Sequence, residues 1–295
     1  MKFIEKNVLV FYLVAVVLGL IFHKFSSKFE FLIPFLIALI MYFSSVNIEI
    51  KNVIKTFYNL KGSLIVLVIN FVLFPILILI VSSAVFGFES FIVAAMVFTF
   101  VLPTATTNVL YSNLLRGDTT FVLTMLVMTS LLSPILVPLI FFLLTRSIIN
   151  VSYSAMFLKL VLIVVIPSIF ASLTKIKAIQ ENSNSLASLI FIIVNFIAAG
   201  ILFNSGILQD YNSLLRIFGF LFVFFVLAFM IVYSIFKKKG NTRHGVSMAL
   251  ITTRRNTSLG VGIASGTLNP IFIAVLLIYQ YIHDISGLAL RRYLK

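Results

Sequence analysis

Two short polar runs interrupt long apolar stretches of this sequence, and their residue types could bind a charged solute. The first run, Pro103–Asn108, reads Pro-Thr-Ala-Thr-Thr-Asn, and the second, Thr252–Ser258, reads Thr-Thr-Arg-Arg-Asn-Thr-Ser. Proline lacks a backbone N–H, and threonine and asparagine side chains compete for backbone hydrogen bonds, so both runs are expected to break a helix. Inside a membrane, broken helices are tolerated beside protein or a water-filled cavity, where a solute can bind.

Arg254 and Arg255, in the second run, have the chemistry best suited to an anion. The forked N–H groups of a guanidinium match a carboxylate, sulfate or phosphate. An arginine near the bilayer centre costs at least about 2.5–3.5 kcal/mol on insertion scales unless it is paired or hydrated. Two alternatives stay open, namely an ion pair with Asp284 and a loop that holds both arginines in cytoplasmic water. The predicted substrate-binding residues are Thr106, Thr107, Asn108, Arg254, Arg255, Asn256 and Thr257.

His283 and Asp284 are adjacent titratable residues in the last apolar stretch. Because histidine titrates near neutral pH, the pair could relay protons. The alternatives are a satisfied interior pair and a helix end close to water. The chain has no cysteine, 3 histidines and 8 acidic residues, which leaves little material for a metal site. No cofactor is predicted, and no paired carboxylates or nucleophile–base constellation suggests an enzyme.

The composition requires lipid around most of the chain. Hydrophobic residues make up 61% and charged residues 10% of the 295 residues, and the mean hydropathy is +1.19. Soluble domains carry roughly 25% charged residues. Apolar runs predict an all-α integral membrane protein with ten transmembrane helices. The predicted spans are 7–25, 31–48, 63–86, 91–115, 119–145, 156–174, 186–207, 213–236, 244–266 and 269–289, joined by short polar connections such as 51–61, 175–185 and 237–243.

The positive charges indicate how the chain is oriented. With the N-terminus in the cytoplasm, 15 of the 22 lysines and arginines lie on the cytoplasmic side, 4 on the other side and 3 within spans. This distribution follows the positive-inside rule, so both termini are expected in the cytoplasm. The compact chain without soluble domains suggests that the bilayer is a prokaryotic plasma membrane. The same distribution explains the net charge of +14 without nucleic acid. The predicted partners are the lipid bilayer and a small anionic substrate.

The spans also suggest an internal repeat. Asn108 and Asn256 are 148 residues apart, and the starts of several spans recur at the same interval. The prediction is two five-helix repeats, over about 1–147 and 148–295. Because five is odd, the second repeat enters from the opposite side, which is the inverted-repeat arrangement of many secondary transporters. The broken helices, spans four and nine, then occupy corresponding positions.

The sequence resembles the bile acid:sodium symporter family, within the wider bile/arsenite/riboflavin transporter superfamily. The motif segments are Thr106–Val109, Leu115–Asp118, Ser130–Pro134 with Pro138, and Asn256–Ala264. The resemblance implies a core domain of spans within 63–145 and 213–289, and a panel domain of spans within 7–48 and 156–207. It further implies that spans four and nine cross, and that an organic anion binds behind the crossing and alternates between the two sides.

The sequence departs from this family at the residues that bind sodium. The family's second crossing helix reads Glu-Val-Gly-Met-Gln-Asn, and its Glu and Gln coordinate sodium. Alignment on Asn256 places Ile251 at the Glu position and Arg255 at the Gln position. Thr107 and Asn108 remain as possible ligands of a coupling ion, and one inference is that Arg255 substitutes for the cation. Coupling to sodium, coupling to protons through His283 and Asp284, and uncoupled exchange all stay open.

The predicted function is secondary active transport of a small organic anion by alternating access. One alternative is an efflux carrier like the arsenite branch of the superfamily. The other is a non-transporting membrane sensor or scaffold with the same fold, a reading that the loss of the sodium ligands supports.

Overall fold

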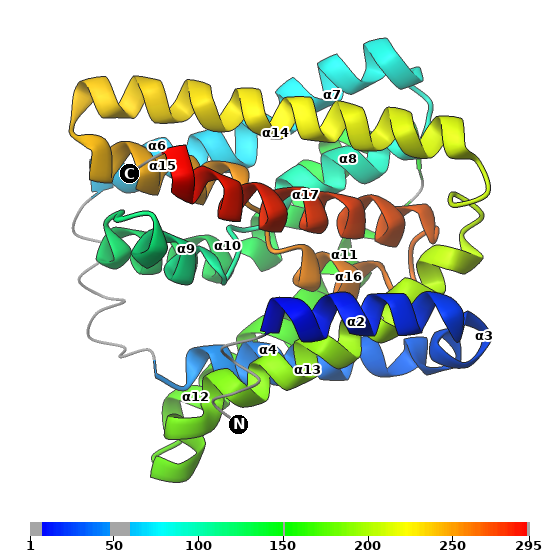
Figure 1. The fold of residues 1–295 in the computed structure, drawn as a ribbon, viewed down its shortest axis with the longest axis horizontal. Coiled ribbons are helices and arrows are strands. Elements are labelled where there is room, and N and C mark those ends of the chain that lie inside the picture. The colour runs from blue at the N-terminus through cyan, green and yellow to red at the C-terminus, as the bar shows by residue number, and fades with distance from the viewer. Residues whose placement is uncertain (1–7, 48–59, 150, 294–295) are drawn as a thin grey trace.

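The structure is a computed structural model that describes residues 8–47, 60–149 and 151–293. Within these residues the regular structure is helical, apart from one isolated antiparallel bridge between Thr104 and Arg255. The predicted connection 51–61 lies almost wholly outside the described residues. Figure 1 shows the helices running mostly along the long axis of the molecule.

The helices have the following bounds. In chain order they are α2 (Val8–Ile21), α3 (His23–Ser26), η1 (Ser27–Leu32), α4 (Ile33–Ser45), α6 (Leu60–Val68), η2 (Ile69–Leu73), α7 (Phe74–Phe86), α8 (Phe91–Val101), α9 (Asn108–Leu114), α10 (Thr119–Thr145), α11 (Tyr153–Leu160), η3 (Val161–Val165), α12 (Ile166–Leu173), α13 (Lys177–Asn204), α14 (Tyr211–Lys239), α15 (Thr242–Thr253), α16 (Thr257–Ala264) and α17 (Ile271–Tyr293). Helix is present in each of the ten predicted ranges.

Several helices have the length and composition of membrane spans. Among the described residues, six helical stretches are long and apolar enough to cross a bilayer, and shorter apolar helices cover Val10–Ile21, Phe91–Val101 and Ile271–Ser286. Many large apolar side chains on these helices are exposed, for example Phe35, Phe170 and Leu215. Lipid is the solvent that suits such a surface, so the chain has the features of a multi-pass membrane protein.

One predicted connection is wrong. The segment 175–185 was expected to be a connection, but α13 begins at Lys177 and continues through Ser185 without a break. Polar side chains stabilise this end of the helix. Lys177 and Glu181 form an exposed ion pair of 3.8 Å, and Asn47, which follows α4, donates a hydrogen bond to Ser183. The length of an apolar run therefore predicts the part of a helix that lies in lipid, but it does not predict a polar extension of the same helix beyond the lipid.

Two proline residues account for irregular turns in otherwise continuous helices. The π-helical turns η2 and η3 end two residues before Pro75 and Pro167, respectively. Proline cannot donate a backbone hydrogen bond and its ring crowds the preceding turn, so the helix widens locally instead of breaking. In η2 this places Asn70 in the interior, where its Nδ2 donates to the carbonyl oxygen of Ile251 at 3.3 Å.

The helices pack as two groups. Helices α2, α4, α12 and α13 contact one another, and a second set, α7, α8, α10, α14, α15 and α17, contact one another. In Figure 1, α2, α4 and α13 lie along one edge of the molecule, α14 lies along the opposite edge, and α17 runs between them. The groups meet where α13 packs on α17, and α16 packs on both α4 and α17. Helix α11 and the turn η3 pack on α10 of the second group.

Small residues allow the close approach of α2 and α13. A Cβ atom added to Gly19 would lie 2.2 Å from the carbonyl oxygen of Phe196 and 2.9 Å from Cβ of Ala199. Backbone atoms cannot yield as a flexible side chain can, so Gly19→Ala should push the helices apart and cost about 1–3 kcal/mol. A Cβ on Gly219 of α14 would meet no atom within 4 Å.

Gly219→Ala is therefore the matched control. It should leave the melting temperature unchanged or raise it, because alanine is a better helix former than glycine by about 0.5–1 kcal/mol. Thermal unfolding of the two variants in the same detergent gives the comparison. Equal melting temperatures would show that the α2–α13 contact does not constrain the fold.

Candidate functional site

The two polar runs break their helices and cross each other. Helix α8 ends at Val101 and α9 begins at Asn108, while α15 ends at Thr253 and α16 begins at Thr257. The extended segments between them pair as a minimal antiparallel ladder. The amide of Ala105 donates to the carbonyl oxygen of Arg254 at 3.0 Å, and the amide of Asn256 donates to that of Pro103 at 2.8 Å. These bonds satisfy backbone groups that the breaks release inside the protein.

Arg254 ties the crossing together from within. Its side chain has no exposed surface, and its guanidinium, which extends from the second broken helix, bonds to groups of the first broken helix and of α17. Nε donates to Oδ1 of Asn108 at 2.8 Å, and Nη1 donates to the carbonyl oxygen of His283. Nη2 donates to Oγ1 of Thr107 at 3.0 Å and to Oδ1 of Asp284 at 2.9 Å. Four of its five N–H groups are thus engaged.

The Tyr111 ring of α9 completes this environment. Cζ of Arg254 lies 3.7 Å from the ring centroid, which is within range of a cation–π contact. The phenol of Tyr111 also donates to the backbone oxygen of Asp284 at 3.1 Å. The carboxylate Oδ1 of Asp284 contacts Nδ1 of His283 at 3.2 Å as well, and Nε2 of His283 is buried without a hydrogen-bond partner. Arg254, Asp284 and His283 therefore form one buried ionic group.

Arg255 points into the other side of the crossing, because successive side chains of an extended segment alternate in direction. It too is fully buried. Its Nη1 donates to the carbonyl oxygen of Leu102 at 3.3 Å, whereas Nε and Nη2 have no hydrogen-bond partner. Cζ lies 5.8 and 5.6 Å from the ring centroids of Phe74 and Phe100.

The charges at the crossing do not cancel. The ion pairs found among the described residues include Arg254 and Asp284 but not Arg255. Two guanidinium groups and one carboxylate leave one positive charge in excess when His283 is neutral. A buried charge without a partner is unfavourable, so this region favours the approach of an anion.

The polar side chains of the crossing differ in their exposure to solvent. Thr106 is half-buried and Thr107 is exposed, whereas Asn108, Asn256 and Thr257 are buried. Oδ1 of Asn256 accepts a hydrogen bond from the amide of Leu259 and caps α16. A solute that reaches the crossing in this conformation therefore meets Thr106 and Thr107 first.

The predicted substrate-binding residues all lie at the crossing, but they face its two sides, which the sequence did not indicate. Thr107, Asn108 and Arg254 are in direct contact, while Arg255 lies apart from them. The expected alternative of an ion pair with Asp284 holds for Arg254. The alternative of a hydrated loop does not hold, since both arginines have no exposed surface. His283 and Asp284 form an interior pair, as one of their alternatives stated, but the pair is not fully satisfied because Nε2 of His283 has no hydrogen-bond partner.

A chain of amide and hydroxyl groups, which the sequence analysis did not predict, joins the two helix groups. Oγ1 of Thr257 donates to Oε1 of Gln280 in α17 at 2.9 Å, and Nε2 of Gln280 donates to Oδ1 of Asn195 in α13 at 3.0 Å. All three residues are buried. A glutamine in the middle of an apolar run was the available signal for this contact.

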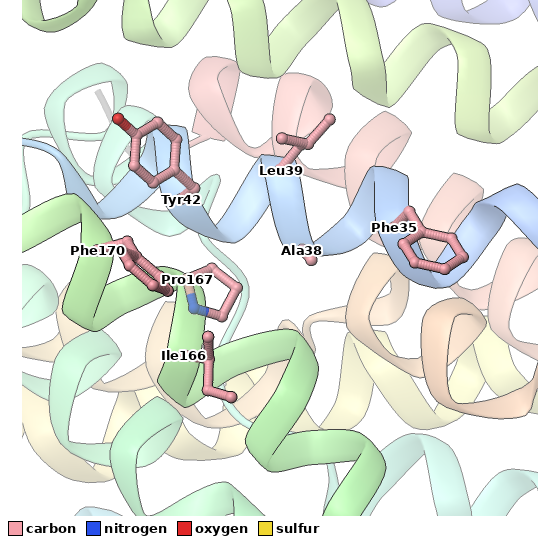
Figure 2. A pocket seen from close by; sticks show the side chains of 7 residues that line it. All are labelled: Phe35, Ala38, Leu39, Tyr42, Ile166, Pro167 and Phe170. Carbon is pink, nitrogen blue, oxygen red and sulfur yellow. The ribbon is translucent and has the colours of Figure 1, made fainter.

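A hollow of about 410 Å³ lies between α4 and α12, and Figure 2 shows the side chains that line it. None of these residues belongs to the crossing. The hollow is lined by Phe35, Ala38, Leu39, Tyr42, Ile166, Pro167 and Phe170. Phe35 and Phe170 are largely exposed, so the hollow opens on the apolar surface of these helices. Its lining has no charged group and does not suit an anion.

Two comparisons with known proteins match part of the chain. The model of a family described as "Sodium Bile acid symporter family" matches residues 34–193, which is more than half of the chain. A curated relative, "Uncharacterized protein YbaS" of Bacillus subtilis (strain 168), is 23% identical over 174 residues. That match covers 59% of this chain and 57% of the relative. The family match includes the first polar run and ends before the second.

Proposed function

Since the chain belongs to the sodium bile acid symporter family, whose members are membrane transporters, we propose that it is a secondary active transporter of a small organic anion. The anion moves by alternating access. The observation that carries the proposal is the crossing itself, where two broken helices meet around two buried guanidinium groups and one carboxylate. Broken helices in this arrangement form the solute sites of many carriers.

Arg254 is the group that receives the anion in this proposal. Its Nη2 contacts Thr107, which is exposed, so the guanidinium lies next to the surface that a solute can reach. A planar fork of N–H groups suits a carboxylate. Arg255, on the other side of the crossing, adds a positive charge without an acidic partner and attracts the same ligand over a longer distance.

Sodium does not fit the residues present. A sodium ion requires oxygen ligands, as other hard cations do. Oγ1 of Thr107 and Oδ1 of Asn108 already accept hydrogen bonds from the Arg254 guanidinium. Ile251 is buried and apolar, and Arg255 places a fixed positive charge four residues further along the chain, in the extended segment that follows α15. We therefore propose transport that is independent of sodium.

The proposed architecture is ten spans in two inverted repeats, over about 1–147 and 148–295, with both termini in the cytoplasm and the protein in the plasma membrane. The helices within 7–48 and 156–207 form a panel domain that moves against a core domain within 63–145 and 213–289. The packing of α13 on α2 and α4, and of α12 on α4, supports this division, while α11 and η3 of the panel range also pack on α10 of the core. The Gln280–Asn195 hydrogen bond crosses the proposed boundary and must rearrange when access alternates.

Uptake into proteoliposomes tests the proposal. Purified protein should carry a carboxylate such as acetate, hexanoate or cholate into liposomes faster than protein-free liposomes take it up. The same vesicles, loaded with the carboxylate, report efflux and so distinguish an importer from an exporter. Folded protein that moves none of them in either direction would favour a membrane sensor or scaffold over a carrier.

A further inference from the structure

The contacts of Arg254 leave one route by which an anion can reach it. The guanidinium has no exposed surface, and its four hydrogen-bonding partners are protein oxygens. Three of these partners, Asn108, His283 and Asp284, are buried residues, although 10% of the Asp284 side chain is exposed. Thr107 is exposed, and it shares Nη2 with Asp284.

A carboxylate that arrives beside Thr107 therefore meets the Asp284 carboxylate where it would itself bind. The two anions cannot share Nη2 without repulsion, because charges of like sign at this distance interact strongly in a low-dielectric site. Neutral Thr107 can stay in place, since a hydroxyl can hydrogen-bond to either anion. The group that must leave Arg254 is Asp284.

We propose that Asp284 is an internal stand-in for the anionic group of the substrate, and that it leaves Arg254 by taking up a proton as the substrate binds. This inference rests on the proposed function and specifies its coupling. The charges balance in this exchange. A substrate carboxylate and one proton enter from the same side, and the proton converts the Asp284 carboxylate to a carboxylic acid. The net charge of the site is unchanged, so substrate and proton move together with 1:1 stoichiometry.

The surroundings of Asp284 suit this exchange. Nδ1 of His283 is in contact with Oδ1 of Asp284, and its ring offers the nearest path for a proton. Among the side chains that the structure describes, the other titratable groups that face Asp284, besides Arg254, are three phenols, from Tyr12 of α2, Tyr111 of α9 and Tyr281 of α17. Phenols keep their protons between pH 5.5 and 8, so among these groups only Asp284 and His283 can supply a dependence on pH.

The test is carboxylate binding to the detergent-purified full chain, measured as the rise in melting temperature with acetate, hexanoate and cholate between pH 5.5 and 8. For wild type, the concentration that gives half of the maximal rise should increase about tenfold per pH unit wherever binding takes up one proton. Asp284→Asn keeps an oxygen at the position of Oδ1 and removes the charge. This variant should bind at least about tenfold more tightly at pH 8, with little dependence on pH.

Two further variants test whether Asp284 is the source of the dependence of carboxylate binding on pH. Asp210→Asn changes an exposed carboxylate that caps α14, and it should keep the wild-type dependence on pH. His283→Asn removes the imidazole, the second group that can supply a dependence on pH, so loss of this dependence in His283→Asn would place the exchanged proton on His283 and overturn the proposal. The proposal is overturned if Asp284→Asn binds no more tightly than wild type, retains the dependence on pH or binds none of the three carboxylates.

The outcomes distinguish this inference from the proposed function. Wild-type binding without dependence on pH, together with carboxylate uptake by liposomes, would retain the transporter and reject the exchange. Absence of both binding and uptake in wild type and in Asp284→Asn would reject both.

Discussion

Replacing Arg254 with glutamine should unfold the protein at a markedly lower temperature and abolish carboxylate binding. The variant leaves Asp284 buried without its cation and removes the hydrogen bonds that join the second broken helix to Asn108 of the first and to α17. Loss of one partner of a buried ion pair costs about 3–5 kcal/mol, because the remaining charge stays uncompensated. Thermal unfolding in detergent measures the loss of stability, and the melting shift with hexanoate measures binding.

A double substitution separates the two effects. Arg254→Gln combined with Asp284→Asn removes both charges, so it should recover part of the stability that Arg254→Gln loses but none of the carboxylate binding. Arg254→Lys keeps the positive charge without the fork, and it should bind carboxylates more weakly than wild type. If Arg254→Gln melts at the wild-type temperature and still binds hexanoate, Arg254 has neither of the roles assigned to it.

Joint replacement of Ile251 by glutamate and Arg255 by glutamine should make the protein sodium-dependent. These substitutions introduce the glutamate and glutamine that the resemblance to the bile acid:sodium symporter family implies at the corresponding positions. The surroundings offer further oxygens, since Oδ1 of Asn70 has no hydrogen-bond partner and the carbonyl oxygen of Leu102 loses its donor when Arg255 is replaced. Sodium at 100 times its dissociation constant would stabilise the variant by about 2.7 kcal/mol.

The single substitutions are the matched controls. Ile251→Glu alone places a carboxylate near the Arg255 guanidinium, which should act as its counter-ion without sodium. Arg255→Gln alone removes the cation but supplies no anionic ligand, so it should bind sodium weakly if at all. Melting temperatures in sodium chloride and in choline chloride give the comparison. An equal sodium response in wild type and in the double variant would show that Arg255 does not take the place of a cation.

The sequence was a good guide to where the helices break. Proline, threonine and asparagine in Pro103–Asn108 and in Thr252–Ser258 predicted the two interruptions, because those residues weaken a helix locally whatever lies around them. Helix in the ten ranges followed from apolar length, which lipid imposes directly. These features depend on nearby residues alone.

The partners at the crossing could not be predicted in the same way. Arg254 and Arg255 are equivalent in composition and adjacent in sequence, yet one pairs with Asp284 and the other lies among Phe74, Phe100 and the Leu102 carbonyl group. Their separation follows from the extended backbone that the Thr104–Arg255 bridge imposes on the break. That bridge joins segments about 150 residues apart, so only the folded chain determines which side each arginine faces. The contact of Gln280 with Asn195 was not predicted for the same reason, because the two residues are 85 positions apart in the sequence.

Carboxylate uptake by proteoliposomes in different cations tests the central claim most directly. Vesicles that contain the wild-type protein take up labelled hexanoate from solutions of sodium, potassium or choline at matched pH and ionic strength. The account predicts the same initial rate in all three solutions, a faster rate with an inward proton gradient, and no protein-dependent uptake with Arg254→Gln. Uptake that disappears when choline replaces sodium, and returns when sodium is restored, would contradict it.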